Sequence, residues 1–222
     1  MSYDSPTKKY YLTEKGWLAT EIIWDTRSLL SRSWIDLTSK PWRYVRRLGS
    51  KDHAILFYDT EDTKQRIVFP FLLAGLLKGS AAAYFVSENK IDSENQGIRN
   101  YGINLDSFKK DALTIKSANE WYLRKGKGEA KTIIANWLSL LTKKQKAGFT
   151  GLSVAGEMDV FFNHGKDKEL VRYEKKLGKQ LPSNLCGLCL YDDTRRLDER
   201  LFIKLITSHG HLIFKNIAAK IT

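Results

Sequence analysis

The sequence has little cysteine and no long apolar run, and each shortage excludes a class of protein. Two cysteines among 222 residues cannot build the disulfide framework of a small secreted protein. The longest apolar candidate, residues 67–77, is too short to cross a bilayer and is typical of a core helix. No apolar segment like that of a signal peptide follows Met1. We therefore expect a cytoplasmic protein that does not use a membrane.

The chain also lacks the motifs of two common enzyme classes. Neither Gly-Lys-Ser nor Gly-Lys-Thr occurs, so no loop combines phosphate-binding backbone amides with a lysine and a magnesium-binding hydroxyl. Asp59, Glu61 and Asp62 follow the first predicted strand and would repel a triphosphate. Gly-x-Ser-x-Gly, the motif of a serine nucleophile, is absent as well. We expect no ATP hydrolysis by the usual mechanism.

Basic residues are in excess. The sequence has 37 lysines and arginines against 25 acidic residues, which gives a net charge of +12 and a pI near 9.6. Such a charge is compatible with nucleic-acid binding. The lysines are scattered over the polar faces of predicted helices, however, and no nucleic-acid-binding motif accompanies them. A charge-driven nucleic-acid-associated protein is therefore an alternative function.

Strands and helices alternate from residue 53 onward. Apolar strands are predicted at 53–59, 80–87, 112–122, 151–158, 184–192 and 211–218, mostly with helical patterns between them. Continuous apolar strands are typical of parallel strands covered on both faces, so we predict an α/β fold with a mainly parallel sheet. The sequence predicts a domain over residues 51–222 and an extension over residues 1–50.

The predicted extension is rich in tryptophan. It holds four of the six tryptophans, Trp17, Trp24, Trp34 and Trp42. A short strand is predicted first, then a helix over residues 18–37 that Pro41 ends. Exposed aromatic residues at this density usually find a partner surface, so a homodimer through this extension is one expectation.

Cys186 and Cys189 form a Cys-x-x-Cys motif within a predicted strand. Residues three apart on a strand point to opposite faces, so the two thiols should diverge. This arrangement favours two buried core cysteines over a redox pair or half of a zinc site.

Several separated pieces of sequence together resemble a known family. They are His53 with Tyr58, Gly75-Leu76 with Gly79, Gly156-Glu157-Met158, Tyr173-Glu174, Cys189 with Tyr191 and Asp192, and His209. In order and spacing they resemble the MEDS domain, the methanogen/methylotroph sensory domain, over residues 53 to about 218. The resemblance implies a RecA/KaiC-like three-layer sandwich without a Walker A loop. It also implies a sensor of a small molecule, proposed to be a hydrocarbon derivative.

The candidate site combines strand-end residues with residues of the family pattern. His53, Glu157, Tyr191 and His209 are expected near the ends of strands in one sheet, and Glu157 would be costly to bury unless paired. The resemblance adds Tyr58, Tyr173, Glu174 and Cys189 as ligand-binding residues. Two histidines and a glutamate could bind a divalent metal or hydrogen-bond a polar ligand, or the histidines could be structural. The sequence names no cofactor.

One conflict is already visible in the sequence. His53 begins its strand whereas Glu157 ends one, so a simple parallel sheet would place them at opposite ends.

The start of the chain resembles another family. Tyr11, Leu12, Thr13 and Gly16 are similar to the last wing strand of archaeal winged-helix regulators. The predicted function is a non-catalytic small-molecule sensor domain of an archaeal or bacterial transcription or signalling regulator. A hydrolase or metal-dependent enzyme that uses Glu157 and the histidines is the other alternative.

Overall fold

The computed structural model describes residues 40–193, 197–215 and 217–221. Its strands form one seven-stranded sheet in the order β3-β2-β4-β5-β1-β6-β7. The strands are β1 (His53–Tyr58), β2 (Ala81–Val86), β3 (Leu113–Ser117), β4 (Leu152–Glu157), β5 (Leu185–Asp192), β6 (His211–Ile213) and β7 (Ala218–Lys220). All neighbouring pairs are parallel except β6 and β7.

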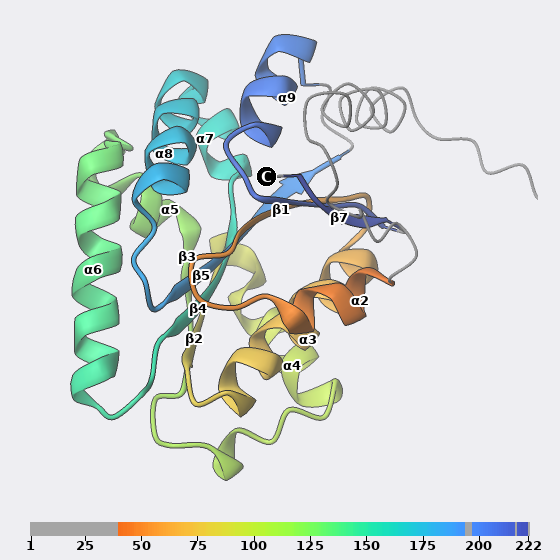
Figure 1. The fold of residues 1–222 in the computed structure, drawn as a ribbon, viewed down its shortest axis with the longest axis vertical. Helices are drawn as coiled ribbons and strands as arrows, with labels where there is room; N and C mark the ends of the chain where they lie inside the picture. The colour runs from red at the N-terminus through yellow and green to blue at the C-terminus, as the bar shows by residue number, and fades with distance from the viewer. Residues whose placement is uncertain (1–39, 194–196, 216, 222) are drawn as a thin grey trace, which may run out of the picture. The chain divides into compact units, whose positions relative to one another are not determined.

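Helices cover both faces of this sheet (Figure 1). One face carries α2 (Pro41–Tyr44), α3 (Glu61–Leu77) and α4 (Ile91–Asn100). The other carries α5 (Ala118–Tyr122), α6 (Ala130–Lys146), α7 (Asp159–Asn163), α8 (Asp167–Gln180) and α9 (Glu199–Ile206). Short 3-10 turns occupy Val45–Arg47, Glu88–Lys90, Leu105–Ser107 and Arg124–Gly126. The predicted α/β three-layer architecture is confirmed.

The core lies between the central strands and the helices. Every residue of β1, β2 and β4 is buried, as the continuous apolar runs predicted. Thr60 caps the start of α3, the helix after β1, because its hydroxyl accepts a hydrogen bond from the Thr63 N–H at 3.1 Å. None of the helices in the described part of the chain is both long and apolar enough for a membrane span.

The structure differs from the sequence-based expectation in two segments and adds a short helix at a third. Pro41 begins the added helix, α2, which suits proline because its missing N–H is not needed there, and the helix that it was predicted to end lies outside the described residues. The predicted closing strand over 211–218 is instead a hairpin, with β6 and β7 joined through a hydrogen bond from the Phe214 N–H to the Ile217 carbonyl. The third strand ends at Ser117, whose hydroxyl caps α5 over residues for which the strand was expected to continue.

Part of the predicted extension lies within the described residues. The segment from Pro41 to Arg47 packs against α3. The predicted strand and tryptophan-rich helix, and the winged-helix resemblance at residues 11–16, lie outside the described residues.

Candidate functional site

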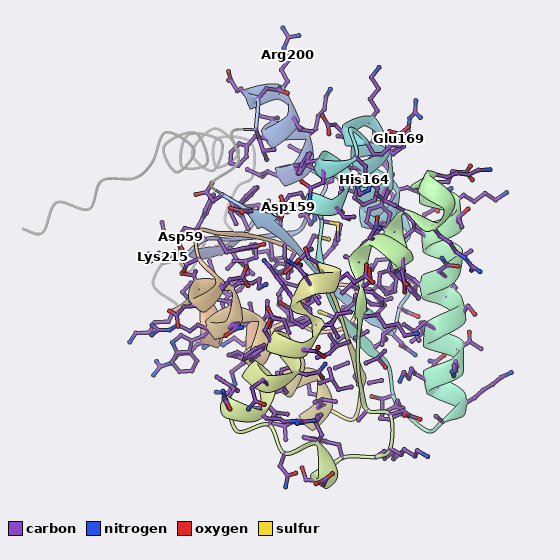
Figure 2. All side chains as sticks on the ribbon, turned by 180° about the vertical axis from the view of Figure 1, so that it is seen from behind. Asp59, Asp159, His164, Glu169, Arg200 and Lys215 are labelled. Atoms are coloured by element: carbon purple, nitrogen blue, oxygen red, sulfur yellow. The ribbon has the colours of Figure 1, made fainter. Side chains whose placement is uncertain are left out.

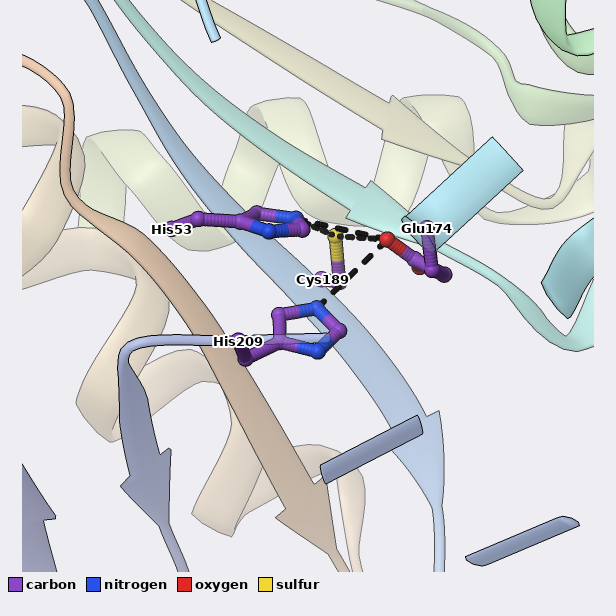
Figure 3. Close-up of side chains that lie close together, drawn as sticks. All are labelled: His53, Glu174, Cys189 and His209. Atoms are coloured by element: carbon purple, nitrogen blue, oxygen red, sulfur yellow. Dashed lines mark hydrogen bonds and ion pairs between the residues drawn. The ribbon is translucent and has the colours of Figure 1, made fainter. Parts of the chain in front are cut away.

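Five of the eight predicted ligand-binding residues come together on the α8 side of the sheet. We call four of them, His53, Glu174, Cys189 and His209, the histidine cluster (Figure 3). All four side chains are buried. The fifth is Tyr191, whose hydroxyl donates a hydrogen bond to Glu174 Oε1 at 2.5 Å.

Glu174 Oε2 is the centre of the histidine cluster. It lies 3.3 Å from His53 Nε2 and 3.5 Å from His209 Nε2. The Cys189 Sγ lies 3.5 Å from the same oxygen and 3.4 Å from His53 Nε2. Two imidazole nitrogens, one sulfur and one carboxylate oxygen thus lie around one small volume, and the dashed lines in Figure 3 mark the contacts between them.

Backbone carbonyls orient both imidazole rings. His53 Nδ1 lies 3.2 Å from the Ser208 carbonyl oxygen, and His209 Nδ1 lies 2.7 Å from that of Leu205. A carbonyl oxygen only accepts, so each Nδ1 carries the proton. The other ring nitrogen of each histidine, Nε2, faces Glu174 within the cluster. The two rings stack, with centroids 3.9 Å apart.

Strand register explains why these residues meet. His53 of β1 aligns with Gly187 of β5, so Cys189 and Tyr191, two and four residues further on, share its face. Glu174 belongs to the buried stripe of α8 that crosses this face. Gly178 lets the helix approach closely, because a Cβ there would lie 2.3 Å from the Ser208 carbonyl oxygen.

The surroundings favour the ionised form of Glu174. Burial alone would raise the pKa of Glu174, but His209, His53 and the Tyr191 hydrogen bond together lower it below its usual value. Burial and the neighbouring His53 lower the pKa of His209 to about 3. Burial, together with Glu174, raises the pKa of both Cys189 and Tyr191.

A basic cavity of about 580 Å³ adjoins the histidine cluster. His53 and His209 line it, at the amino-terminal edge of the sheet. Five exposed lysines line it too: Lys51, Lys175, Lys179, Lys204 and Lys220. Its carboxylate, Asp52, lies 3.1 Å from His211 Nε2. The cavity therefore has the charge to receive an anion.

Glu157 belongs to a second polar cluster, at the carboxyl edge of the sheet. The ammonium group of Lys64 lies 2.6 Å from Glu157, 2.8 Å from Glu94 and 2.5 Å from Glu61. Ser87 donates its N–H and its hydroxyl to the other oxygen of Glu157, both at 2.9 Å. We call Lys64 with these three glutamates the lysine cluster.

The lysine cluster leaves little for Glu157 to bind. The three carboxylates could hold a metal by their spacing, but the Lys64 ammonium already lies among them and donates to each. Burial alone would lower the pKa of Lys64, but Glu157 and Glu94 raise it above its ordinary value. Lys64 is therefore a permanent internal cation that neutralises Glu157.

The eight predicted residues do not lie together in one site. Glu157 aligns with Leu190 of β5, three residues beyond Gly187, the partner of His53. This separation is about 10 Å along the strand, and the alternation of side chains places Glu157 on the opposite face. Tyr58 also lies on the lysine side, with its ring 5.6 Å from Lys64 Nζ. Tyr173 lies in an aromatic layer, where its hydroxyl accepts from Trp137 Nε1 at 3.0 Å.

The connection between β1 and α3, where a phosphate loop would lie, is short and acidic. Only Asp59 and Thr60 separate β1 from α3, which is too few residues to wrap a phosphate. Asp59 is paired with Lys215 at 2.9 Å, and Figure 2 shows the two side chains together. It also accepts a hydrogen bond from the Thr63 hydroxyl at 2.8 Å.

The two cysteines lie as the strand pattern predicted. Both are free and buried, and Cys189 faces Glu174 of α8. Burial is the main cause that raises the pKa of Cys186, to which Asp52 and Lys78 add opposite effects. Lys78 is the C-cap residue of α3. The Cys186 thiol, which Lys78 influences, therefore lies on the α3 side of the sheet, whereas Cys189 lies on the α8 side.

Sequence reasoning missed Lys64 and the lysines of the cavity. A lysine in the first turns of an otherwise apolar helix, three residues after Glu61, was the available signal for a buried ion pair. The cavity lysines come from α8, α9, β7 and the turn before β1, and no local pattern connects them.

Comparisons with known proteins agree with this architecture. Residues 52–210 match the family described as MEDS, the methanogen/methylotroph, DcmR sensory domain. No curated protein is matched. A solved structure of the Pyrococcus horikoshii OT3 protein PH0250 is similar with a TM-score of 0.51 and 4% identity, covering 80% of this chain and 88% of that one. At this identity the likeness concerns the fold alone.

Two further structures show weaker likeness. A solved ATPase domain has a TM-score of 0.48 and 10% identity, covering 88% of this chain and 81% of that one. The flagellar accessory protein FlaH from Methanocaldococcus jannaschii has a TM-score of 0.41 and 16% identity, covering 81% and 78%. The family match spans well over half of the sequence and includes the histidine cluster, so the chain belongs to the MEDS family of sensory domains.

Proposed function

We propose that this domain senses a small anionic molecule, bound in the cavity beside the histidine cluster. The supporting observation is the cavity itself, in which five lysines surround the two buried histidines. Its volume of about 580 Å³ lies in the range of small-molecule sites. In a transcription or signalling regulator, ligand binding there would be communicated to a partner through the N-terminal segment.

The chemistry of the lining narrows the ligand class. An uncharged hydrocarbon derivative would gain little from lysine ammonium groups and would leave them in water. A short carboxylate or a phosphate would interact favourably with several of them at once. The proposed ligand is therefore an oxidised or phosphorylated form of a small organic molecule.

Helix ends offer a simpler explanation for some of these lysines. Lys179 and Lys204 lie in the last turns of α8 and α9, where cations interact favourably with the helix dipole. Lys51 and Lys220 lie outside any helix, yet they line the same cavity. Convergence from four segments favours ligand binding over helix capping alone.

The enzyme alternative needs Glu157 and a histidine to act together. The two lie on opposite faces of the sheet, and Lys64 and Ser87 occupy the oxygens of Glu157. This geometry supports the sensor over an acid–base pair made from those residues.

Calorimetric titration with propionate, inorganic phosphate and 1-propanol tests the proposal. Propionate or phosphate should bind and 1-propanol should not. The double variant Lys175→Gln/Lys179→Gln should bind the anion at least about fivefold more weakly per lysine removed, because a unit charge near 4 Å contributes about 1 kcal/mol or more.

The matched control removes two exposed lysines from outside the cavity. Lys131→Gln/Lys146→Gln on α6 lowers the net charge equally and should leave the affinity unchanged. Equal weakening in both double variants would show that only overall charge matters. Preferential binding of 1-propanol would contradict the anionic ligand.

A further inference from the structure

Four of the six distances between ligand atoms in the histidine cluster match those of a tetrahedral zinc site. Zinc binds thiolate at about 2.3 Å, imidazole at about 2.0–2.1 Å and carboxylate at about 2.0–2.2 Å. At the tetrahedral angle, such bonds separate neighbouring donor atoms by about 3.4–3.6 Å. In the cluster, four of the six separations are 3.3, 3.4, 3.5 and 3.5 Å, and all four atoms lie within 4.8 Å of one another.

The rings are also held as metal-binding histidines are held. Each Nδ1–H donates to a backbone carbonyl, which is the usual outer contact of an imidazole that binds metal through Nε2. His209 Nε2 is buried and has no hydrogen-bond partner among the described residues. The Tyr191 hydroxyl fixes the remaining oxygen of Glu174, which completes an outer shell.

The set of ligand atoms points the same way. Nε2 of both histidines, one oxygen of Glu174 and the Cys189 sulfur face one another within one buried volume. A divalent cation would attract all four donors, and its charge would balance one thiolate and one carboxylate in a buried site.

We propose that His53, Glu174, Cys189 and His209 bind one zinc ion. Nitrogen and sulfur ligands together favour zinc over magnesium or calcium, which prefer oxygen. Four protein ligands close the coordination sphere, as in structural zinc sites. The ion would join the start of β1, the middle of α8, strand β5 and the segment before β6. The inference concerns the cluster itself and does not depend on anion binding in the cavity.

Cobalt substitution in the full chain tests the site directly. The protein is stripped with a chelator, dialysed and titrated with Co²⁺, and zinc stoichiometry is measured by a chromogenic chelator. We expect one ion per chain, intense visible bands of tetrahedral cobalt and a thiolate-to-cobalt charge-transfer band. Absence of the thiolate band in wild type, or no stoichiometric binding, would overturn the proposal without any variant.

Variants assign the ligands. Cys189→Ser should abolish the charge-transfer band, whereas Cys186→Ser, the matched control on the same strand, should retain it. Tyr191→Phe keeps all four ligands and should weaken zinc binding by about 10–100-fold, the usual effect of an outer-shell change. A charge-transfer band that persists in Cys189→Ser and disappears in Cys186→Ser would refute the assignment.

The zinc and anion proposals fail separately. Binding of propionate without zinc would contradict only the zinc proposal. Binding of zinc without an anion would contradict only the proposed ligand class.

Discussion

Replacing Lys64 by methionine should be among the most destabilising single changes in this domain. Lys64 is fully buried and is ion-paired with Glu61, Glu94 and Glu157. Methionine is similar in length and fits an apolar helix, so the change removes the charge with little loss of volume. It leaves two buried carboxylates, Glu94 and Glu157, without a counterion.

The expected cost follows from the burial of the partners. Removing one member of a buried ion pair typically costs about 3–5 kcal/mol, because the remaining charge is left uncompensated. A domain of ordinary stability has about 5–15 kcal/mol in total. With an m-value of about 2 kcal/mol/M, the urea midpoint should fall by about 2 M.

The pH dependence has a defined sign. The folded-state pKa of Lys64 is raised above its ordinary value of 10.5, so its contribution is complete below that pH and is lost only as pH rises through the higher folded value. Lys64→Met should therefore be less stable than wild type at pH 7. The deficit should shrink as the pH falls into the carboxylate range, because protonation removes the unpaired charges.

Urea unfolding followed by tryptophan fluorescence measures this effect. Lys90→Met is the matched control, since Lys90 also pairs with Glu61 but at the surface, where such a pair is worth at most about 1 kcal/mol. The double variant Lys64→Met/Glu157→Gln should lose less than the sum of its single changes. Equal midpoints for Lys64→Met and Lys90→Met would refute the buried lysine cluster.

Three further experiments test the packing and electrostatics of the domain. Gly178→Ala should cost about 1–3 kcal/mol in urea unfolding, because its Cβ would lie 2.3 Å from the Ser208 carbonyl; Gly49→Ala, with open space around it, should be nearly neutral. Burial would raise the pKa of Glu61, but Lys64 and Lys90 lower it, so its stabilisation is complete above pH 4.5 and fades as the pH falls through the lower folded value. Glu61→Gln should therefore be less stable than wild type at pH 7, by no more than about 1 kcal/mol, and the two should converge in acid. The two cysteines should react with a disulfide reagent at pH 8 only as the protein unfolds, since both are buried with raised thiol pKa values; rapid labelling of the folded protein would contradict this burial.

Much of the fold could be predicted from local patterns. Continuous apolar runs identified β1, β2, β4 and β5, because parallel strands buried on both faces need apolar residues throughout. The missing phosphate loop and the diverging thiols of Cys186 and Cys189 were equally visible, since both follow from a few neighbouring residues. The hairpin of β6 and β7 was missed because two three-residue strands leave too short a pattern to separate from one.

The candidate site was predicted only in part. The family pattern named His53, Glu174, Cys189, Tyr191 and His209, and these do meet. It also placed Glu157 with them. A polar residue at the end of a strand can be recognised in the sequence, but the sequence does not show at which edge of the sheet it lies. The alternation of side chains along β5 could have separated Glu157 from the histidines only if the register were already known.

The sequence by itself determined which segments become strands and helices, because apolar periodicity and capping act over a few residues. The tertiary structure alone decided which polar groups became partners. Lys64 and Glu157 are 93 residues apart, and strand order with register brings them together on one face while Glu174 collects the histidines on the other. The energy of a buried charge depends on the atoms around it after folding, and no local pattern in the chain specifies those neighbours.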